Sequence, residues 1–297
     1  MSAQELSVPP GGPSIKVRRA KSEDATLCGR ICFDAFDKIS AQHGFPPDIQ
    51  SPEVAVGILS MMFSHPGFYC LVAESDGCIV GSNCLDERSA IAGLGPITVD
   101  PGVQNRGVGR TLMEAMLVRA RERNFPGVRL LQSAFHNRSL ALYSRLGFDA
   151  REPLSVMQGP PLRKRIEGCS VRPARISDAE DCRRICLQVH GHDRAGELAD
   201  AIKNGTAVVV ERHERITGYA TVLAFFGHAV AETNLDVQAL IASAEAFGGP
   251  GIIVPTRNSE LFRWCLANGL RVVEPMTLMT LGLYNEPAGA YLPSIHF

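Results

Sequence analysis

The sequence predicts an α/β protein made of two tandem copies of one unit, each a central mixed, mostly antiparallel sheet flanked by helices. The first observation behind this prediction is an internal repeat. Three segments return in the same order: 17–32 as 171–186, 71–81 as 208–218, and 144–157 as 266–279. The second observation is that short apolar segments typical of strands alternate with segments of helical spacing inside each copy.

The repeat sets the predicted domain boundaries. Residues 1–14 are rich in proline and glycine and are expected to form a flexible tail. The first copy spans 15–158, a linker rich in proline, glycine and then basic residues covers 159–168, and the second copy spans 169–297. Fused copies of this kind are expected to pack as a pseudo-dimer within a monomer, or to form a homodimer.

The composition excludes several classes of protein. With 297 residues, 45% of them hydrophobic and 21% charged, the chain has the composition of an ordinary globular protein. A formal net charge of −1 argues against nucleic-acid and anionic-membrane partners. No apolar run reaches the length of a signal peptide core or a spanning helix. Nine cysteines without a CxxC pair suit a reducing compartment, so we expect a cytoplasmic protein.

The first copy begins with a short predicted strand at 15–19. A helix follows, capped by Ser22 or Asp24, and its apolar face is formed by Leu27, Ile31, Ala35 and Phe36. A second helix is expected at 51–64. These elements precede the longer strands of the sheet.

A predicted hairpin follows, with its turn at Ser-Asp-Gly (75–77), and then a third strand at 89–99. From Val108, apolar residues such as Leu112 and Met116 recur every four positions, which predicts an amphipathic helix.

A strand at 128–134, a helix capped by Asn137 and ended by Gly147, and final strands through 157 complete the first copy. An antiparallel meander followed by a strand–helix–strand crossover predicts one mixed sheet with helices on both faces.

The loop before the helix at Val108 reads VDPGVQNRGVGR and predicts an anion cradle. Backbone N–H groups are unpaired in the first turn of a helix, and Gly107 and Gly109 let them approach a phosphate. Arg106 and Arg110 add positive charge at the rim. The alternative is a tight strand-to-helix turn without a ligand. The dinucleotide fingerprint is incomplete, since Leu112 stands at its third glycine, and no GKS or GKT follows.

The same stretch resembles the Q/R-x-x-G-x-G/A motif of the GNAT acyltransferase superfamily. The segment HNRSLALYSRLGF (136–148) resembles that family's following N-x(5)-Y-x(3)-G-F pattern. The resemblance covers 15–157 and extends weakly over 169–285, where no glycine pair follows an amide-rich loop. It implies a sheet splayed between its fourth and fifth strands, acetyl-CoA or another acyl-CoA as donor, and a tandem protein with an intact first and a degenerate second domain.

The resemblance also implies the residues of the cofactor site. In it, the amides of 104–109 would hold the diphosphate, and Ile97 and Val99 would pair with the pantetheine arm. Tyr143 would protonate the departing sulfur, although a core role for this side chain stays open. The cofactor contacts implied are Ile97, Thr98, Val99, Gln104, Asn105, Arg106, Gly107, Val108, Gly109, Arg110, Asn137 and Tyr143.

The implied reaction is direct transfer of an acetyl group from acetyl-CoA to a primary amine, which we expect to belong to a small molecule. Asp86, Glu87 and Asp100 are candidate general bases, and each is alternatively a solvated carboxylate. No metal is expected. Two other functions stay open: a non-catalytic acyl-CoA sensor or scaffold, and a nucleotide-binding module.

The second copy has candidates of its own. Cys265 stands where Tyr143 aligns, so the acid is missing there. The HGHD segment (190–193) is a candidate for a metal or substrate site, against the alternative of an ordinary loop. His228, Glu232 and Asn234 are candidates for an acceptor pocket, against ordinary strand and cap roles.

Overall fold

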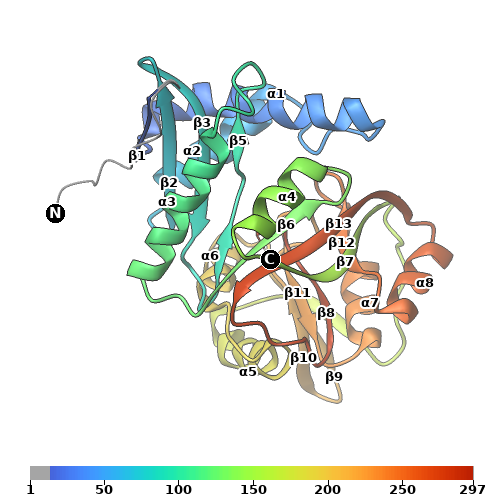
Figure 1. Ribbon diagram of the computed structural model, residues 1–297. Coiled ribbons are helices and arrows are strands. Elements are labelled where there is room, and N and C mark those ends of the chain that lie inside the picture. Colours follow the sequence, from blue (N-terminus) through green and yellow to red (C-terminus); the bar gives the residue numbers. More distant parts are fainter. Residues whose placement is uncertain (1–13, 297) are drawn as a thin grey trace. The chain divides into compact units, whose positions relative to one another are not determined.

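The computed structural model describes residues 14–296 (Figure 1). By its contacts the described chain divides into two compact units. Unit 1 contains residues 14–87 and 94–125, and unit 2 contains residues 88–93 and 126–296. The division falls inside the first copy, so the last part of that copy folds together with the second copy.

Unit 1 contains a small antiparallel sheet. Its elements are β1 (Ile15–Arg19), α1 (Ala25–His43), α2 (Pro52–Ser64), β2 (Phe68–Ser75), β3 (Cys78–Asp86), β5 (Thr98–Val99) and α3 (Val108–Glu122). Strand β2 pairs with β1 and β3, and β5 pairs with β3. The predicted strand at 15–19, the hairpin and the helix from Val108 are therefore confirmed.

The single strand predicted over 89–99 is wrong, because the structure divides it. Strand β4 (Ala92–Leu94) and strand β5 are separated by Gly95 and Pro96. Proline has no N–H to donate, which interrupts the ladder. Val99 pairs antiparallel with Gly81 in unit 1, whereas the start of β4 pairs parallel with β6 (Gly127–Ser133) in unit 2.

The apolar face predicted for the first helix is confirmed at Ile31, which is buried, and is wrong at Leu27. Leu27 is 47% exposed, and the buried side of α1 runs through Cys28 and Cys32. A short 3₁₀ turn precedes α1, and the Asp24 carboxylate accepts the backbone N–H of Lys21 at 2.8 Å. The small cysteine side chains let α1 pack closely, as the sequence predicts for buried cysteines.

Unit 2 contains two sheets. In chain order its further elements are α4 (Asn137–Arg145), β7 (Asp149–Gln158), β8 (Ser170–Pro173), α5 (Ala179–His190), α6 (Ala195–Lys203), β9 (Val208–Arg212), β10 (Arg215–Ala220), β11 (Ala229–Ala231), α7 (Asn234–Ser243), β12 (Ile252–Pro255), α8 (Ser259–Ala267), β13 (Arg271–Gly282) and β14 (Ala290–Leu292). The final strands predicted through 157 form the single strand β7.

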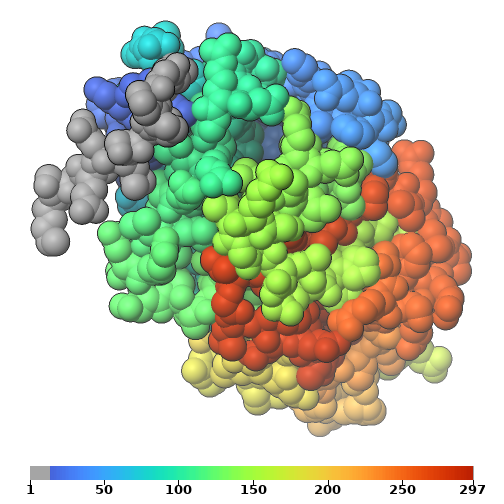
Figure 2. Space-filling view, in the orientation of Figure 1, coloured from blue at the N-terminus to red at the C-terminus, as the bar shows by residue number. Residues whose placement is uncertain are grey.

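One sheet of unit 2 interleaves strands from the two copies. Its order is β4-β6-β13-β7-β12, and β13 pairs antiparallel with both β6 and β7. Strands of the first and second copies therefore alternate, and Figure 2 shows their green-to-yellow and orange-to-red segments side by side. Leu154, Ile253 and Leu278 from three of these strands are buried in one cluster. The copies are joined by a shared core as well as by the linker.

The other sheet of unit 2 belongs to the second copy and has the order β14-β11-β10-β9-β8. Strand β14 lies on the edge of β11, with Tyr291 opposite Val230. The four neighbouring pairs are all antiparallel. A late segment of the chain thus completes the second copy's sheet.

Among residues 14–296, none of the helices combines the length and apolar character needed to cross a membrane.

Candidate active site

The loop between β5 and α3 is closed by Asp100. The N–H of Asp100 donates to the carbonyl of Val80 at 2.9 Å, which anchors the loop to β3. The Asp100 carboxylate accepts the N–H of Gly102 at 2.7 Å. The carbonyl of Asp100 also accepts the N–H of Val103 at 2.9 Å. This carboxylate, one of the three candidate bases, therefore shapes the loop.

Gln104 ties the same loop to the end of the strand. Its Nε2 donates to the carbonyl of Val99 at 3.2 Å. The sequence analysis did not predict this side-chain contact, because the motif implied a role only for the backbone amides of 104–109. Thr98 is buried, Val99 is half-buried, and Ile97 lies just before β5.

Gly107 has a backbone conformation that favours glycine, and it lies next to open space. It is the N-cap of α3, with φ at +90°, where a side chain is strained. A Cβ built there would meet nothing nearer than the Ile15 side chain at 3.9 Å. Asn105 also has a positive φ of +66°. The approach to the helix is therefore open on the side where a ligand would lie.

The first turn of α3 is suited to an anion. The N–H groups of Val108, Gly109 and Arg110 precede the first intrahelical donor, because Thr111 N–H bonds to Gly107 O at 3.0 Å. No acidic residue lies in this turn. The exposed Arg106 and Arg110 add to the positive end of the helix dipole. These residues fit the diphosphate of an acyl-CoA.

Asn137 and Tyr143 lie in unit 2, whereas residues 97–110 lie in unit 1. The capping role predicted for Asn137 is wrong, since His136 is the N-cap of α4 and Asn137 is its first helical residue. Tyr143 is 7% exposed, and its ring centroid lies 6.2 Å from that of Phe148. Burial raises the pKa of the Tyr143 phenol, which keeps it a proton donor at neutral pH.

Glu87 is held by arginines. Its carboxylate accepts from Arg119 at 2.7 and 2.9 Å, and Arg123 lies 3.7 Å away. These contacts tie the Glu87 carboxylate to α3. Asp86, at the end of β3, is buried.

The second copy carries a carboxylate where the first has its glycine cradle. The backbone N–H and hydroxyl of Thr233, the N-cap of α7, both donate to the Asp236 carboxylate. Arg212 also donates to Asp236 at 2.9 Å. Burial by itself raises the pKa of Asp236, but the hydrogen bonds from Arg212, Thr233 and Thr217 outweigh it and lower the pKa below its usual value. An ionised carboxylate at this helix start repels a diphosphate.

Two further features separate the second copy from the first. Strand β14 lies along β11, the strand that precedes the helix start. Cys265 on α8 is fully buried, and burial raises the pKa of its thiol to about 12. This thiol therefore stays protonated and has no access to a ligand.

The histidines of the second copy form a buried cluster. The Nε2 atoms of His190 and His228 lie 3.1 Å apart, and the His190 and His192 rings are stacked at 5.6 Å. Burial lowers the pKa of His190 and His228 and that of His192 to about 4. Across the described residues, no group of three or more His, Cys, Asp or Glu side chains is arranged to hold a metal ion.

Comparisons with known proteins found similar sequences and similar folds. Residues 34–148 match the acetyltransferase (GNAT) family. An uncharacterized N-acetyltransferase of Escherichia coli (strain K12) is 26% identical over 141 residues, which are 45% of this chain and 81% of that protein. The match to the family therefore includes the cradle and Tyr143.

Solved structures extend the similarity in fold to both copies. A candidate acetyltransferase from Pyrococcus horikoshii is 20% identical with a TM-score of 0.74, over 98% of this chain and 97% of its own. A tandem GNAT protein from the clavulanic acid biosynthesis pathway is 14% identical with a TM-score of 0.54, over 90% and 98% of the two chains. Residues 34–148 of this chain therefore match the acetyltransferase (GNAT) family, and the fold of the chain is similar to that of a tandem GNAT protein.

Proposed function

We propose that this protein transfers an acetyl group from acetyl-CoA directly to the primary amine of a small molecule. The observation that carries the proposal is the start of α3. There, Gly107 leaves open space, three N–H groups have no helical partner, and the first turn has no carboxylate.

Bound acetyl-CoA supplies the thioester, and the chain positions it. The amides of 104–109 and the side chains of Arg106 and Arg110 hold the diphosphate. The backbone at Ile97, Thr98 and Val99 pairs with the pantetheine arm, and Asn137 contacts the cofactor. Most of the rate enhancement then comes from proximity, since both substrates are held together.

Tyr143 is the proposed acid. As the amine nitrogen bonds to the carbonyl carbon, the carbon–sulfur bond breaks and the phenol donates its proton to the thiolate. The amine nitrogen releases its proton to water, and a proton from water restores the phenol. Its raised pKa and its place in the α4 motif support this role. A small-molecule acceptor is inferred because the sequence has no acidic stretch that would bind a basic protein tail.

The direct test is the release of CoA thiol from acetyl-CoA over a panel of small primary amines, with a matched panel of basic peptides. We expect turnover with at least one small amine and none with the peptides. Binding of acetyl-CoA without turnover on any amine would instead indicate a sensor. Competition by ATP but not by CoA would indicate a nucleotide-binding module.

A further inference from the structure

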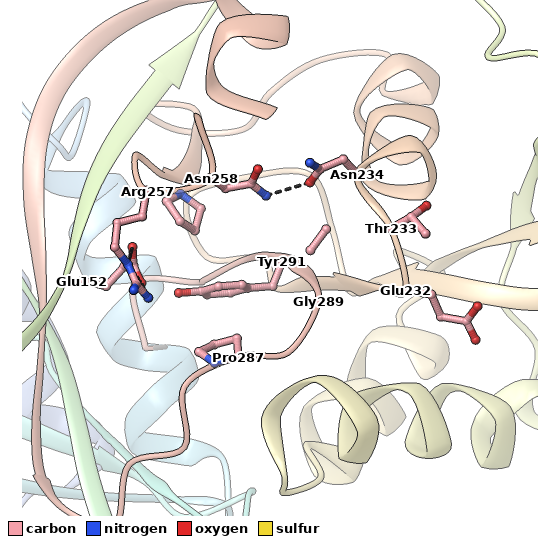
Figure 3. A pocket seen from close by; sticks show the side chains of 11 residues that line it. Glu152, Glu232, Thr233, Asn234, Arg257, Asn258, Pro287, Gly289 and Tyr291 are labelled. Carbon is pink, nitrogen blue, oxygen red and sulfur yellow. Dashed lines mark hydrogen bonds and ion pairs between the residues drawn. The ribbon is translucent and has the colours of Figure 1, made fainter. Parts of the chain in front are cut away.

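A pocket of about 550 Å³ lies in the second copy, apart from the cradle of the first (Figure 3). Three segments surround it: the start of α7 at 232–234, the end of β12 and start of α8 at 255–258, and the returning segment at 287–291. Glu152 of β7 also lines it. By the internal repeat, the first two segments correspond to the cofactor loop and the start of α4 in the first copy.

The pocket does not suit an acyl-CoA. Strand β14 takes the edge of β11, so no pantetheine arm can pair there. The Asp236 carboxylate occupies the start of α7 and disfavours a diphosphate. The remaining volume is that of a site for a small molecule.

Arg257 is the one cation that lines the pocket. Its Nε and Nη2 donate to the buried carboxylate of Glu152 at 2.7–3.1 Å, and its Nη1 donates to Glu286 at 2.6 Å. A guanidinium has five N–H groups, so these contacts use one N–H on each nitrogen and leave two. Figure 3 shows Arg257 and Glu152 together at one side of the pocket.

Tyr291 supplies a hydroxyl that the protein leaves without a partner. The residue is 5% exposed, and among the described residues nothing hydrogen-bonds its Oη. In Figure 3 the ring lies across the pocket with its oxygen directed toward Arg257 and Glu152. Burying a hydroxyl unpaired is costly, so such a group is expected to have a partner from outside the chain.

Two asparagines add donors on the opposite wall. Asn258 Nδ2 donates to Asn234 Oδ1 at 2.7 Å, and Asn234 Nδ2 donates to Glu260 at 2.9 Å. Each amide nitrogen keeps a second N–H. The Glu232 carboxylate is already paired, because Arg215 donates to both of its oxygens at 2.6 Å. Arg257, Tyr291 and the two asparagines therefore give the pocket N–H and O–H donors that the described residues leave unused.

We propose that this pocket binds a small molecule through a carboxylate, which accepts hydrogen bonds from Arg257, Tyr291 and the asparagine amides. The proposal does not depend on the transferase site in the first copy. It gives the second copy, whose cofactor loop is lost, a ligand of its own.

The test uses isothermal titration of the full chain with three probes of similar size: glutarate, its neutral diamide and 1,5-diaminopentane. We expect glutarate to bind with a Kd of about 1 mM or tighter, and the other two not to bind. Saturating acetyl-CoA should leave glutarate binding unchanged. Tighter binding of the diamine, equal binding of the diamide, or no binding of glutarate would overturn the proposal.

A pair of tyrosine variants supplies the control. Tyr291→Phe removes only the unpartnered hydroxyl, so it should weaken glutarate about tenfold without lowering the melting temperature. Tyr284→Phe removes another buried hydroxyl that has no partner among the described residues, but Tyr284 does not line the pocket. It should bind glutarate like the wild type. Equal affinity in the wild type and Tyr291→Phe would contradict the assignment.

Discussion

At the scale of single residues, the first copy and the second differ most at the start of one helix. Gly107 is held at a positive φ next to open space, whereas Thr233 and Asp236 close the equivalent start of α7 with a hydrogen-bonded carboxylate. The difference reverses the charge that each helix start offers to a diphosphate. Acetyl-CoA binding is therefore expected in the first copy alone.

The first prediction concerns Tyr143. Tyr143→Phe removes the proposed proton donor but keeps the buried ring, so kcat should fall about 100-fold while the Kd for acetyl-CoA changes less than about twofold. Steady-state kinetics with one amine and a separate binding titration measure the two effects. An unchanged kcat across the pH range would show that the phenol is a core side chain.

The second prediction concerns Gln104. Gln104→Met keeps the length of the side chain but removes the donor to the Val99 carbonyl, so the loop should be held less firmly. One neutral hydrogen bond corresponds to about a fivefold rise in the Kd for acetyl-CoA, with kcat at saturation unchanged. A fall in kcat without a change in Kd would place Gln104 in the chemistry instead.

At the scale of elements, the sequence predicts those with strong local signals. The hairpin at 75–77, the helix from Val108 and the strand at 15–19 are all confirmed, because turn residues and periodicity are local properties. The division of 89–99 was missed because apolar residues continue on both sides of Pro96. The exposed Leu27 was missed because the small side chains of Cys28 and Cys32 form part of the packed side of α1, next to Ile31.

In the candidate site, too, the features with local sequence signals could be predicted and those that depend on tertiary contacts could not. The glycine pair, the arginines and the tyrosine could be predicted from the sequence, because each belongs to a short continuous motif. The Gln104 contact and the role of Asp100 could not be predicted from the sequence, since both depend on how the loop closes onto β3 and β5. The pocket at Arg257 and Tyr291 depends on β14 returning to β11, which no spacing in the sequence indicates.

The third prediction concerns the interleaved sheet. Leu278 is fully buried on β13, a strand of the second copy that lies between β6 and β7 of the first. Leu278→Ala should therefore lower the free energy of unfolding by about 2–5 kcal/mol. Leu266→Ala, at a position 45% exposed on α8, is the matched control and should cost less than about 0.5 kcal/mol. Urea unfolding measures both, and equal midpoints would contradict the shared core.

At the scale of the whole molecule, the buried histidines give stability a dependence on pH. Their pKa values are lowered in the folded protein from an ordinary 6.5, for His192 to about 4, because burial disfavours the charged ring. The unfolded chain therefore binds protons below pH 6.5 that the folded chain does not. Stability from these groups is complete above pH 6.5 and is lost as the pH falls toward 4.

The fourth prediction follows from that window. His192 alone should lower the free energy of unfolding by about 2 kcal/mol between pH 7 and pH 5. His192→Gln, which cannot be protonated, should flatten this part of the profile. Urea midpoints measured from pH 4 to 8 test it, and a flat wild-type profile between 6.5 and 5 would contradict the assigned neutral state.

The central claim is that one cradle, at Gly107, holds the diphosphate of acetyl-CoA. Isothermal titration of acetyl-CoA into the wild type, Gly107→Glu and Gly77→Glu tests it directly. Gly77 also has a positive φ, of +79°, and open space around it, so it controls for backbone strain. We predict one site per chain in the wild type and in Gly77→Glu, and none in Gly107→Glu. Two sites per chain, or unchanged affinity in Gly107→Glu, would contradict the claim.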